Sequence, residues 1–155
     1  RLIEFEPSGS ILRPGRQCRY VLSPTPLIDW FPNVCSGGEN FFFNVSAITE
    51  TMLIALERAC VQNPAGTTVF NPIQLFAVTL SGSTAKKTRL LDLSTLVPRL
   101  SPALAQLENF EGLAFGPLAG GRRTLLMVSD DNFRATQKTS FLLFGMRSSL
   151  GARRP

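Results

Sequence analysis

The sequence predicts an all-β fold made of β-propeller blades, with about two and a half four-stranded antiparallel blades in an incomplete ring. Short apolar runs alternate with turns rich in Gly, Pro, Asn and Ser, as in strands joined by hairpins. The order of these runs repeats along the chain. Each repeat contains about four runs, which is the signature of a propeller blade.

The expected strands follow this repeat in order. The first unit contributes only its end, at residues 1–5 and 18–22, with a turn at 6–10 between them. The strands of the second and third units are expected at 41–48, 51–59, 73–80 and 86–93, and then at 110–115, 122–129 and 140–146. The segments rich in Pro and Gly between these runs are expected to be loops.

One short helix is expected between the second and third units, over residues 101–108. Ser101 is a good N-cap, and Pro102 suits the first helical position. Leu104 and Leu107 fall on one side of such a helix. The helix would belong to a connecting segment.

The repeat is supported by segments that recur in the same order. The aligned pairs are "RLIEFEPSGS" at 1–10 with "QLFAVTLSGS" at 74–83, "NVSAITETMLIALERA" from Asn44 with the segment from Asn109, and "IQLFAV" from Ile73 with "SFLLFG" from Ser140. The alternative is a β-sandwich with accidental similarity. A closed propeller needs about four to eight blades. We therefore expect a fragment or a chain that pairs with further blades, and a third unit without its outer strand.

Length and composition favour one folded domain. The chain has 155 residues, of which 44% are hydrophobic, and we expect a domain at 1–146 followed by a basic tail at 147–155. The net charge is +5, but the Lys and Arg residues are scattered and are not interleaved with aromatics, so a nucleic-acid partner is not expected. No apolar stretch approaches the roughly 18 residues of a membrane helix, so a membrane span is not expected.

The chain contains no His, which excludes Ser-His-Asp and Cys-His chemistry built from this chain alone. Cys18, Cys35 and Cys60 have no CxxC spacing, so a structural zinc site is not expected. They form either one disulfide with a free thiol, or three buried thiols. The sequon at Asn44 is compatible with secretion. The expected location is secreted, periplasmic or the lumen of an organelle.

Residues 107–146, "LENFEGLAFGPLAGGRRTLLMVSDDNFRATQKTSFLLFGM", resemble the C-terminal signature of the esterase-like phytase domain family. "TMLIALERA" and "LLDLSTL" are similar to earlier segments of that family. The resemblance implies the C-terminal part of a longer β-propeller domain. It also implies hydrolysis of phosphate or carboxylate esters.

Polar residues in the third unit are candidates for a site. Asn109 and Glu111 open its inner strand, and Asp130 and Asn132 end the next strand. Adjacent antiparallel strands place the start of one beside the end of the other. Carboxylate and amide oxygens suit calcium, with Asp130 and Glu111 as candidate catalytic groups. The alternative is that "SDDN" is only a turn, and Asp131 is the best candidate for a plain turn residue.

Arg58, Arg122 and Arg123 are candidates for binding phosphate oxygens through bidentate contacts. The alternative for Arg122 and Arg123 is a solvated hairpin flank. For Glu57 and Arg58, the alternative is a solvated ion pair or a contact between blades.

We therefore expect a metal-assisted hydrolase with a small anionic ester or phosphate as substrate. The competing hypothesis is a non-catalytic propeller segment that binds the remaining blades or another protein chain.

Overall fold

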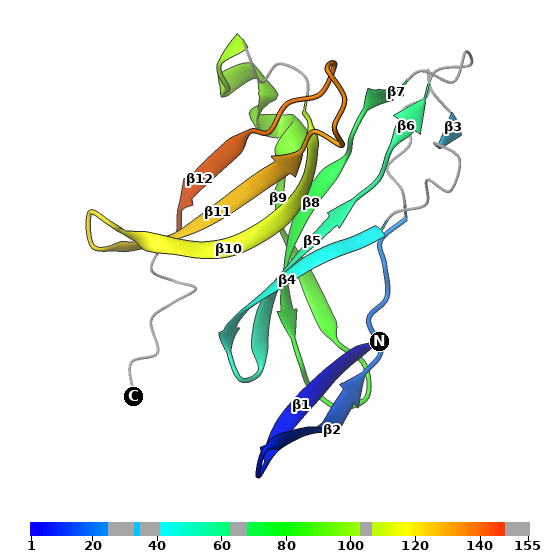
Figure 1. Cartoon of the computed structure of the whole chain (residues 1–155), viewed down its shortest axis with the longest axis vertical. Coiled ribbons are helices and arrows are strands. Elements are labelled where there is room, and N and C mark those ends of the chain that lie inside the picture. Colours follow the sequence, from blue (N-terminus) through cyan, green and yellow to red (C-terminus); the bar gives the residue numbers. More distant parts are fainter. Residues whose placement is uncertain (25–32, 35–40, 63–67, 103–106, 148–155) are drawn as a thin grey trace.

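The computed structural model describes residues 1–24, 33–34, 41–62, 68–102 and 107–147 (Figure 1). Its strands form antiparallel sheets. The first sheet contains β1 (Leu2–Ser8) and β2 (Ile11–Cys18); the second contains β4 (Phe41–Thr49), β5 (Met52–Arg58), β8 (Ile73–Thr79) and β9 (Lys86–Asp92), in that order. The third contains β10 (Asn109–Ala119), β11 (Arg122–Asp130) and β12 (Phe141–Gly145), and a small sheet contains β3 (Asn33–Val34), β6 (Val61–Gln62) and β7 (Thr68–Phe70).

The architecture confirms the predicted all-β, propeller-like fold. The order β4-β5-β8-β9 is an antiparallel meander of four strands, as in a propeller blade. The β10–β12 sheet has three strands among the described residues, which matches the expected missing outer strand. Figure 1 shows the β1–β2 hairpin below the four-stranded sheet and the β10–β12 sheet to its left, without a closed ring.

The start of the chain differs from the prediction. The second strand is Ile11–Cys18 and not residues 18–22. The chain turns tightly at Gly9, which has φ +65°, so the return strand begins earlier than its apolar pattern indicates. After Cys18 the backbone leaves the hairpin, and Arg19 exchanges hydrogen bonds with Ser83 and Ala85. The segment therefore connects the hairpin to the turn between β8 and β9.

The connecting segments also differ from the prediction. Segments expected to be loops contain the short strands β3, β6 and β7, which satisfy their backbone groups by pairing with one another. The described helix is a 3₁₀-helix, η1 (Leu93–Arg99), whose N-cap Asp92 accepts a hydrogen bond from the Ser94 amide. Residues 103–106 of the predicted helix at 101–108 lie outside the described residues.

The internal repeat extends to the detail of strand register. In the first pair, Phe42 opposes Glu57 and Asn44 opposes Leu56, so one extra residue forms a bulge on β4. The β10–β11 pair has the same irregularity at Glu111, between Phe110 and Gly112. Matching the two bulges makes Asn44 the equivalent of Gly112, three positions further along than the sequence alignment with Asn109 places it.

The four-stranded sheet is packed on both faces. On one face, Ile54, Leu56, Ile73 and Leu75 pack against the β10–β12 sheet, which contributes Phe110, Leu113, Leu125, Met127 and Leu142. On the other face, Ala55, Phe76 and Val78 pack toward Leu2 and Tyr20 of the first unit. The inner strands β4 and β10 also approach each other, since the Ser46 hydroxyl donates a hydrogen bond to the Leu113 carbonyl at 3.0 Å. Neighbouring units are therefore joined face to face.

Gly112 is required by a close approach within the β10–β11 pair. A Cβ atom at this position would lie 2.3 Å from Cγ1 of Val128, so Gly112→Ala should lower the free energy of unfolding by about 1–3 kcal/mol in urea denaturation. Adding Val128→Ala should recover part of this loss if the clash is its cause. Gly145→Ala is the matched control, because its Cβ would meet no atom within 4 Å. Equal effects of the two glycine substitutions would contradict the packing argument.

Candidate active site

A polar cluster lies where β5 and β10 come together between two sheets. Arg58 ends β5, and its Nη2 lies 3.3 Å from Oε1 of Glu111 near the start of β10. The Asn109 side-chain amide donates to the same Glu111 oxygen at 2.8 Å. Arg58 Nη1 also donates to Oδ1 of Asn71 at 3.4 Å, and Asn71 donates to the Leu107 carbonyl at 3.0 Å. The structure thus brings together Arg58, Asn109 and Glu111 from the predicted set.

Burial gives this cluster a fixed geometry. The side chain of Arg58 is 14% exposed and that of Glu111 is 35% exposed, while Asn71 and Asn109 are buried. Burial lowers the pKa of Arg58, and the Glu111 carboxylate opposes that shift. Glu111 is therefore a partly accessible carboxylate, held by a cation and an amide on one of its oxygens.

Asp130 lies apart from this cluster, although its backbone is in register with Asn109. Along β11 the side chains alternate, and the buried Met127 and Ser129 lie on the face that packs on the four-stranded sheet. Asp130 follows Ser129 and is exposed on the opposite face. Glu111 contacts Arg58 of the four-stranded sheet and so lies on the first face. Among the described residues, no hydrogen bond or ion pair joins Asp130 to Glu111, and Asp130 Oδ1 accepts from the Asn132 amide instead.

The residues after β11 form a hydrogen-bonded turn. Asp130 Oδ1 accepts from the Asn132 amide and Asp131 Oδ1 accepts from the Phe133 amide, both at 2.9 Å. Asn132 and Phe133 have positive φ angles of 50° and 55°, and the Asn132 side chain donates to Gln137 at 2.9 Å. These are the side-chain-to-backbone bonds by which Asp and Asn build turns. The expectation that "SDDN" includes turn chemistry, with Asp131 as a turn residue, agrees with this geometry.

The expected calcium site would use the carboxylates of Glu111 and Asp130 and the side-chain oxygens of Asn109 and Asn132. These oxygen donors are of the right type, although the Arg58 guanidinium already compensates the charge of Glu111. Within the described part of the chain, no group of three or more His, Cys, Asp or Glu residues could hold a metal ion. Calcium prefers six to eight oxygens. Its binding here stays a prediction.

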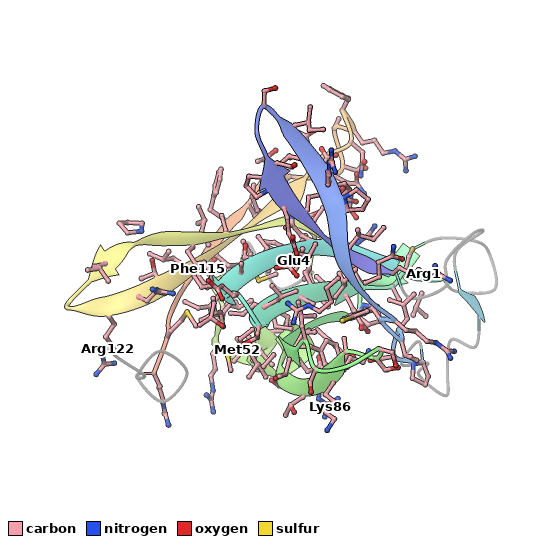
Figure 2. The ribbon with its side chains drawn as sticks, turned by 90° about the horizontal axis from the view of Figure 1, so that it is seen from below. Arg1, Glu4, Met52, Lys86, Phe115 and Arg122 are labelled. Atoms are coloured by element: carbon pink, nitrogen blue, oxygen red, sulfur yellow. The ribbon has the colours of Figure 1, made fainter. Side chains whose placement is uncertain are left out.

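Arg122 and Arg123 lie at the other end of β11 from Asp130. Figure 2 shows Arg122 at the outer tip of the β10–β11 hairpin. The Arg123 guanidinium lies over the Phe115 ring, 5.2 Å from its centroid. The structure does not bring these two arginines to Arg58, and their position matches the alternative of a hairpin flank.

Glu57 forms a second polar cluster on the opposite face of β5. Its fully buried carboxylate accepts hydrogen bonds from the Tyr20 hydroxyl at 2.6 Å and from the Ser23 amide at 3.0 Å. It also forms an ion pair with Lys87 of β9. Burial raises the pKa of Glu57, but the hydrogen bonds from Lys87, Tyr20 and Ser23 outweigh that effect and hold the pKa below its ordinary value. This is a contact between units, one of the alternatives for Glu57.

No pattern in the sequence indicated Tyr20 or Lys87 as partners of Glu57. Lys87 also donates to the Ser23 hydroxyl at 2.8 Å, which superficially resembles a Ser–Lys hydrolytic pair. Lys87 is at the same time paired with the Glu57 carboxylate, which compensates its charge. The Glu57 cluster therefore connects the first unit to β5 and β9.

The cysteines differ in state. Cys60 is disulfide-bonded, and Cys18 is a buried free thiol that contacts the Gly82 carbonyl at 3.2 Å. Of the two alternatives, this matches a disulfide together with a free thiol. Cys35 lies outside the described residues.

One comparison with known proteins gave a match. A family model described as phytase-like, esterase-like activity of phytase, matches residues 1–133. No curated protein and no solved structure gave a match. Among the described residues, no helix is long and apolar enough to cross a membrane.

Replacing Glu57 by Gln tests the buried ion pair. Glu57→Gln should lower the free energy of unfolding at neutral pH by about 3 kcal/mol, because it leaves the Lys87 charge largely buried without its counter-ion. The folded-state pKa of Glu57 is below its ordinary value. The ionised Glu57 therefore stabilises the folded protein above its unfolded-state pKa of about 4.3. This stabilisation is lost as the pH falls through the folded-state pKa.

The difference in the free energy of unfolding between wild type and Glu57→Gln should therefore become smaller below about pH 4, as measured by urea denaturation at a series of pH values. Glu50→Gln, at an exposed position in the β4–β5 turn, is the control and should change the free energy of unfolding by no more than about 0.5 kcal/mol. If Glu57→Gln changed the free energy of unfolding as little as Glu50→Gln does, the result would contradict the role of the buried ion pair.

Proposed function

Because the chain belongs to the phytase-like family, whose model matches residues 1–133, we propose that it is a hydrolase domain for a carboxylate or phosphate ester, with Glu111 at its catalytic centre. The observation that carries the proposal is the Arg58–Glu111 pair between two sheets. It joins an accessible carboxylate to a fixed cation. These are the two kinds of group that ester hydrolysis needs, a base for water and a positive charge for the oxyanion.

The cluster supports a single-displacement mechanism. Glu111 accepts a proton from a water molecule, and the water oxygen attacks the carbonyl carbon or the phosphorus atom of the ester. The bond to the leaving alkoxide breaks, and the proton returns from Glu111 to that alkoxide. Arg58 stabilises the developing negative charge, and Asn109 holds the Glu111 carboxylate in one orientation at 2.8 Å.

Charge favours a small ester with little negative charge. Arg58 is the cation of the described cluster, and Glu111 offsets its charge at 3.3 Å. Arg122 and Arg123 begin β11, at the end of that strand remote from the Asn109–Asp130 register pair. A polyphosphate would require several converging cations. A carboxylate ester or a phosphate monoester is therefore the better candidate substrate.

The competing proposal is a non-catalytic segment that binds further blades or another protein chain. It is favoured by apolar side chains on the outer sheet, where Phe141 and Leu143 are 65% and 58% exposed. Such exposure on a sheet face is typical of an interaction surface.

An oxidising compartment is also proposed. The disulfide of Cys60 supports a secreted, periplasmic or lumenal location, because disulfides persist in those environments and are rare in the cytosol.

Hydrolysis of p-nitrophenyl acetate and p-nitrophenyl phosphate by wild type and by Glu111→Gln tests the catalytic proposal. The substitution preserves size and removes the base, so kcat should fall by about 100-fold or more. Glu50→Gln is the control and should retain full activity. Assays with added calcium and with a chelator test the metal separately from Glu111.

Retained activity in Glu111→Gln would remove Glu111 from the mechanism. If Asp130→Asn alone abolished turnover, the centre would lie on the other face of the β10–β12 sheet. A wild-type protein without turnover of either ester, with or without calcium, would favour the non-catalytic alternative.

A further inference from the structure

Asn71 is a buried amide that connects the two units at the Glu111 cluster. It lies two residues before β8. Its Oδ1 atom accepts a hydrogen bond from Nη1 of Arg58 at 3.4 Å, and its Nδ2 atom donates to the Leu107 carbonyl at 3.0 Å. Arg58 ends β5 of the second unit, and Leu107 lies two residues before β10 of the third. One side chain therefore spans the boundary across which Arg58 meets Glu111.

The backbone on each side of this bridge is anchored by other contacts. The Ala59 amide donates to the Pro72 carbonyl at 2.9 Å, which fixes the backbone beside Asn71 relative to the end of β5. Leu107 is only 3% exposed and belongs to the apolar core between the sheets. Because both anchors are packed or hydrogen-bonded, the amide between them has one well-defined place.

The position requires both halves of an amide group. An asparagine side chain offers an acceptor oxygen and a donor nitrogen, which here meet the Arg58 guanidinium and the Leu107 carbonyl. Exchanging the oxygen and the nitrogen would oppose donor to donor and acceptor to acceptor, so one orientation of the amide satisfies both partners. A carboxylate at this position would accept from Arg58 but would lack a donor for the Leu107 carbonyl.

The two groups that Asn71 holds lead to the same oxygen of Glu111. Arg58 Nη2 donates to Oε1 of Glu111 at 3.3 Å, and the Asn109 side chain donates to that oxygen at 2.8 Å. Asn71 contacts Arg58 directly, and it binds the carbonyl that lies two residues before Asn109. It therefore acts on both donors that orient the Glu111 carboxylate.

We propose, on the basis of the proposed hydrolase function, that Asn71 is a positioning residue for the Glu111 centre. It sets the orientation of Arg58 and of the start of β10, and through them the orientation of the base relative to the cation. Asn71 is buried and acts on the ester only through these groups. Its loss should therefore lower kcat and leave KM close to the wild-type value.

Steady-state kinetics of Asn71→Ser, with the p-nitrophenyl ester that the wild type hydrolyses, test this role. Serine is too short to reach both partners, so kcat should fall about tenfold or more, with KM within about twofold of wild type. Asn71→Asp adds a negative charge beside Arg58, which disfavours the ionised form of a carboxyl group nearby. The acid limb of its kcat/KM profile should therefore move to higher pH, by about one unit.

Gln74→Ser is the matched control, because Gln74 is also a buried amide. Its side chain donates to Oδ2 of Asp92 at 3.1 Å, and its neighbour Leu75 faces the core between the sheets, so Gln74 lies on the opposite face of β8. Gln74→Ser should lower the free energy of unfolding as Asn71→Ser does, but leave kcat and the pH profile unchanged. Wild-type kcat in Asn71→Ser, or an equal loss of kcat in both serine variants, would overturn the positioning role.

An NMR titration of the Glu111 carboxyl group separates the role of Asn71 from the hydrolase function, because it needs no substrate. The Glu111 signal is assigned by its loss in Glu111→Gln. Its titration midpoint should lie at higher pH in Asn71→Asp than in wild type, and it should be unchanged in Gln74→Ser. If the midpoint moved in this way in a protein that hydrolyses neither ester, the hydrolase function would fail and the positioning of Glu111 by Asn71 would stand. An unmoved midpoint would overturn the positioning role in either case.

Discussion

Successive side chains of a strand point to opposite faces of its sheet, and at the end of β5 this alternation connects three units. Glu57 points back to Tyr20 of the first unit, and Arg58 points forward to Glu111 of the third. Each is a charge held largely away from water, which is tolerated only when partners compensate it. The positions of both neighbouring units are therefore tied to the same two residues of one strand.

The apolar core sets the geometry of the candidate site. Phe110, which is fully buried, lies beside Glu111 in the chain, and Leu56 precedes Glu57 and Arg58 on β5. These apolar side chains belong to one cluster between the sheets, so their packing holds the backbones of β5 and β10 at a fixed separation. A site held by two rigid strands keeps its groups in place more accurately than one held by loops. The family membership and this placement support the same location for the proposed chemistry.

The fold class and the repeat, including three strands in the described part of the last unit, could be predicted because they depend on the order and period of apolar runs. The pairing of Glu111 with Arg58, in place of a shared site with Asp130, could not be predicted in this way. A bulge at Glu111 adds one residue to β10, which changes the face on which a polar residue lies, and apolar periodicity does not reveal one extra residue. The hydrogen bond from Tyr20 to Glu57 could not be predicted for a related reason. The segment around Tyr20 has the composition of a strand, but it leaves the hairpin and contacts Glu57.

The register also relates Asp130 to Arg58. Arg58 pairs with Phe41 and Asp130 pairs with Asn109, each at the strand end beyond its bulge. Arg58 projects from the face of the four-stranded sheet that packs on the β10–β12 sheet, and it meets Glu111 there. Asp130 occupies the corresponding register position in the last sheet, with the opposite charge. The repeat therefore keeps a charged residue at this strand end but not its sign, so an ion pair like that of Arg58 with Glu111 would need a cation opposite Asp130.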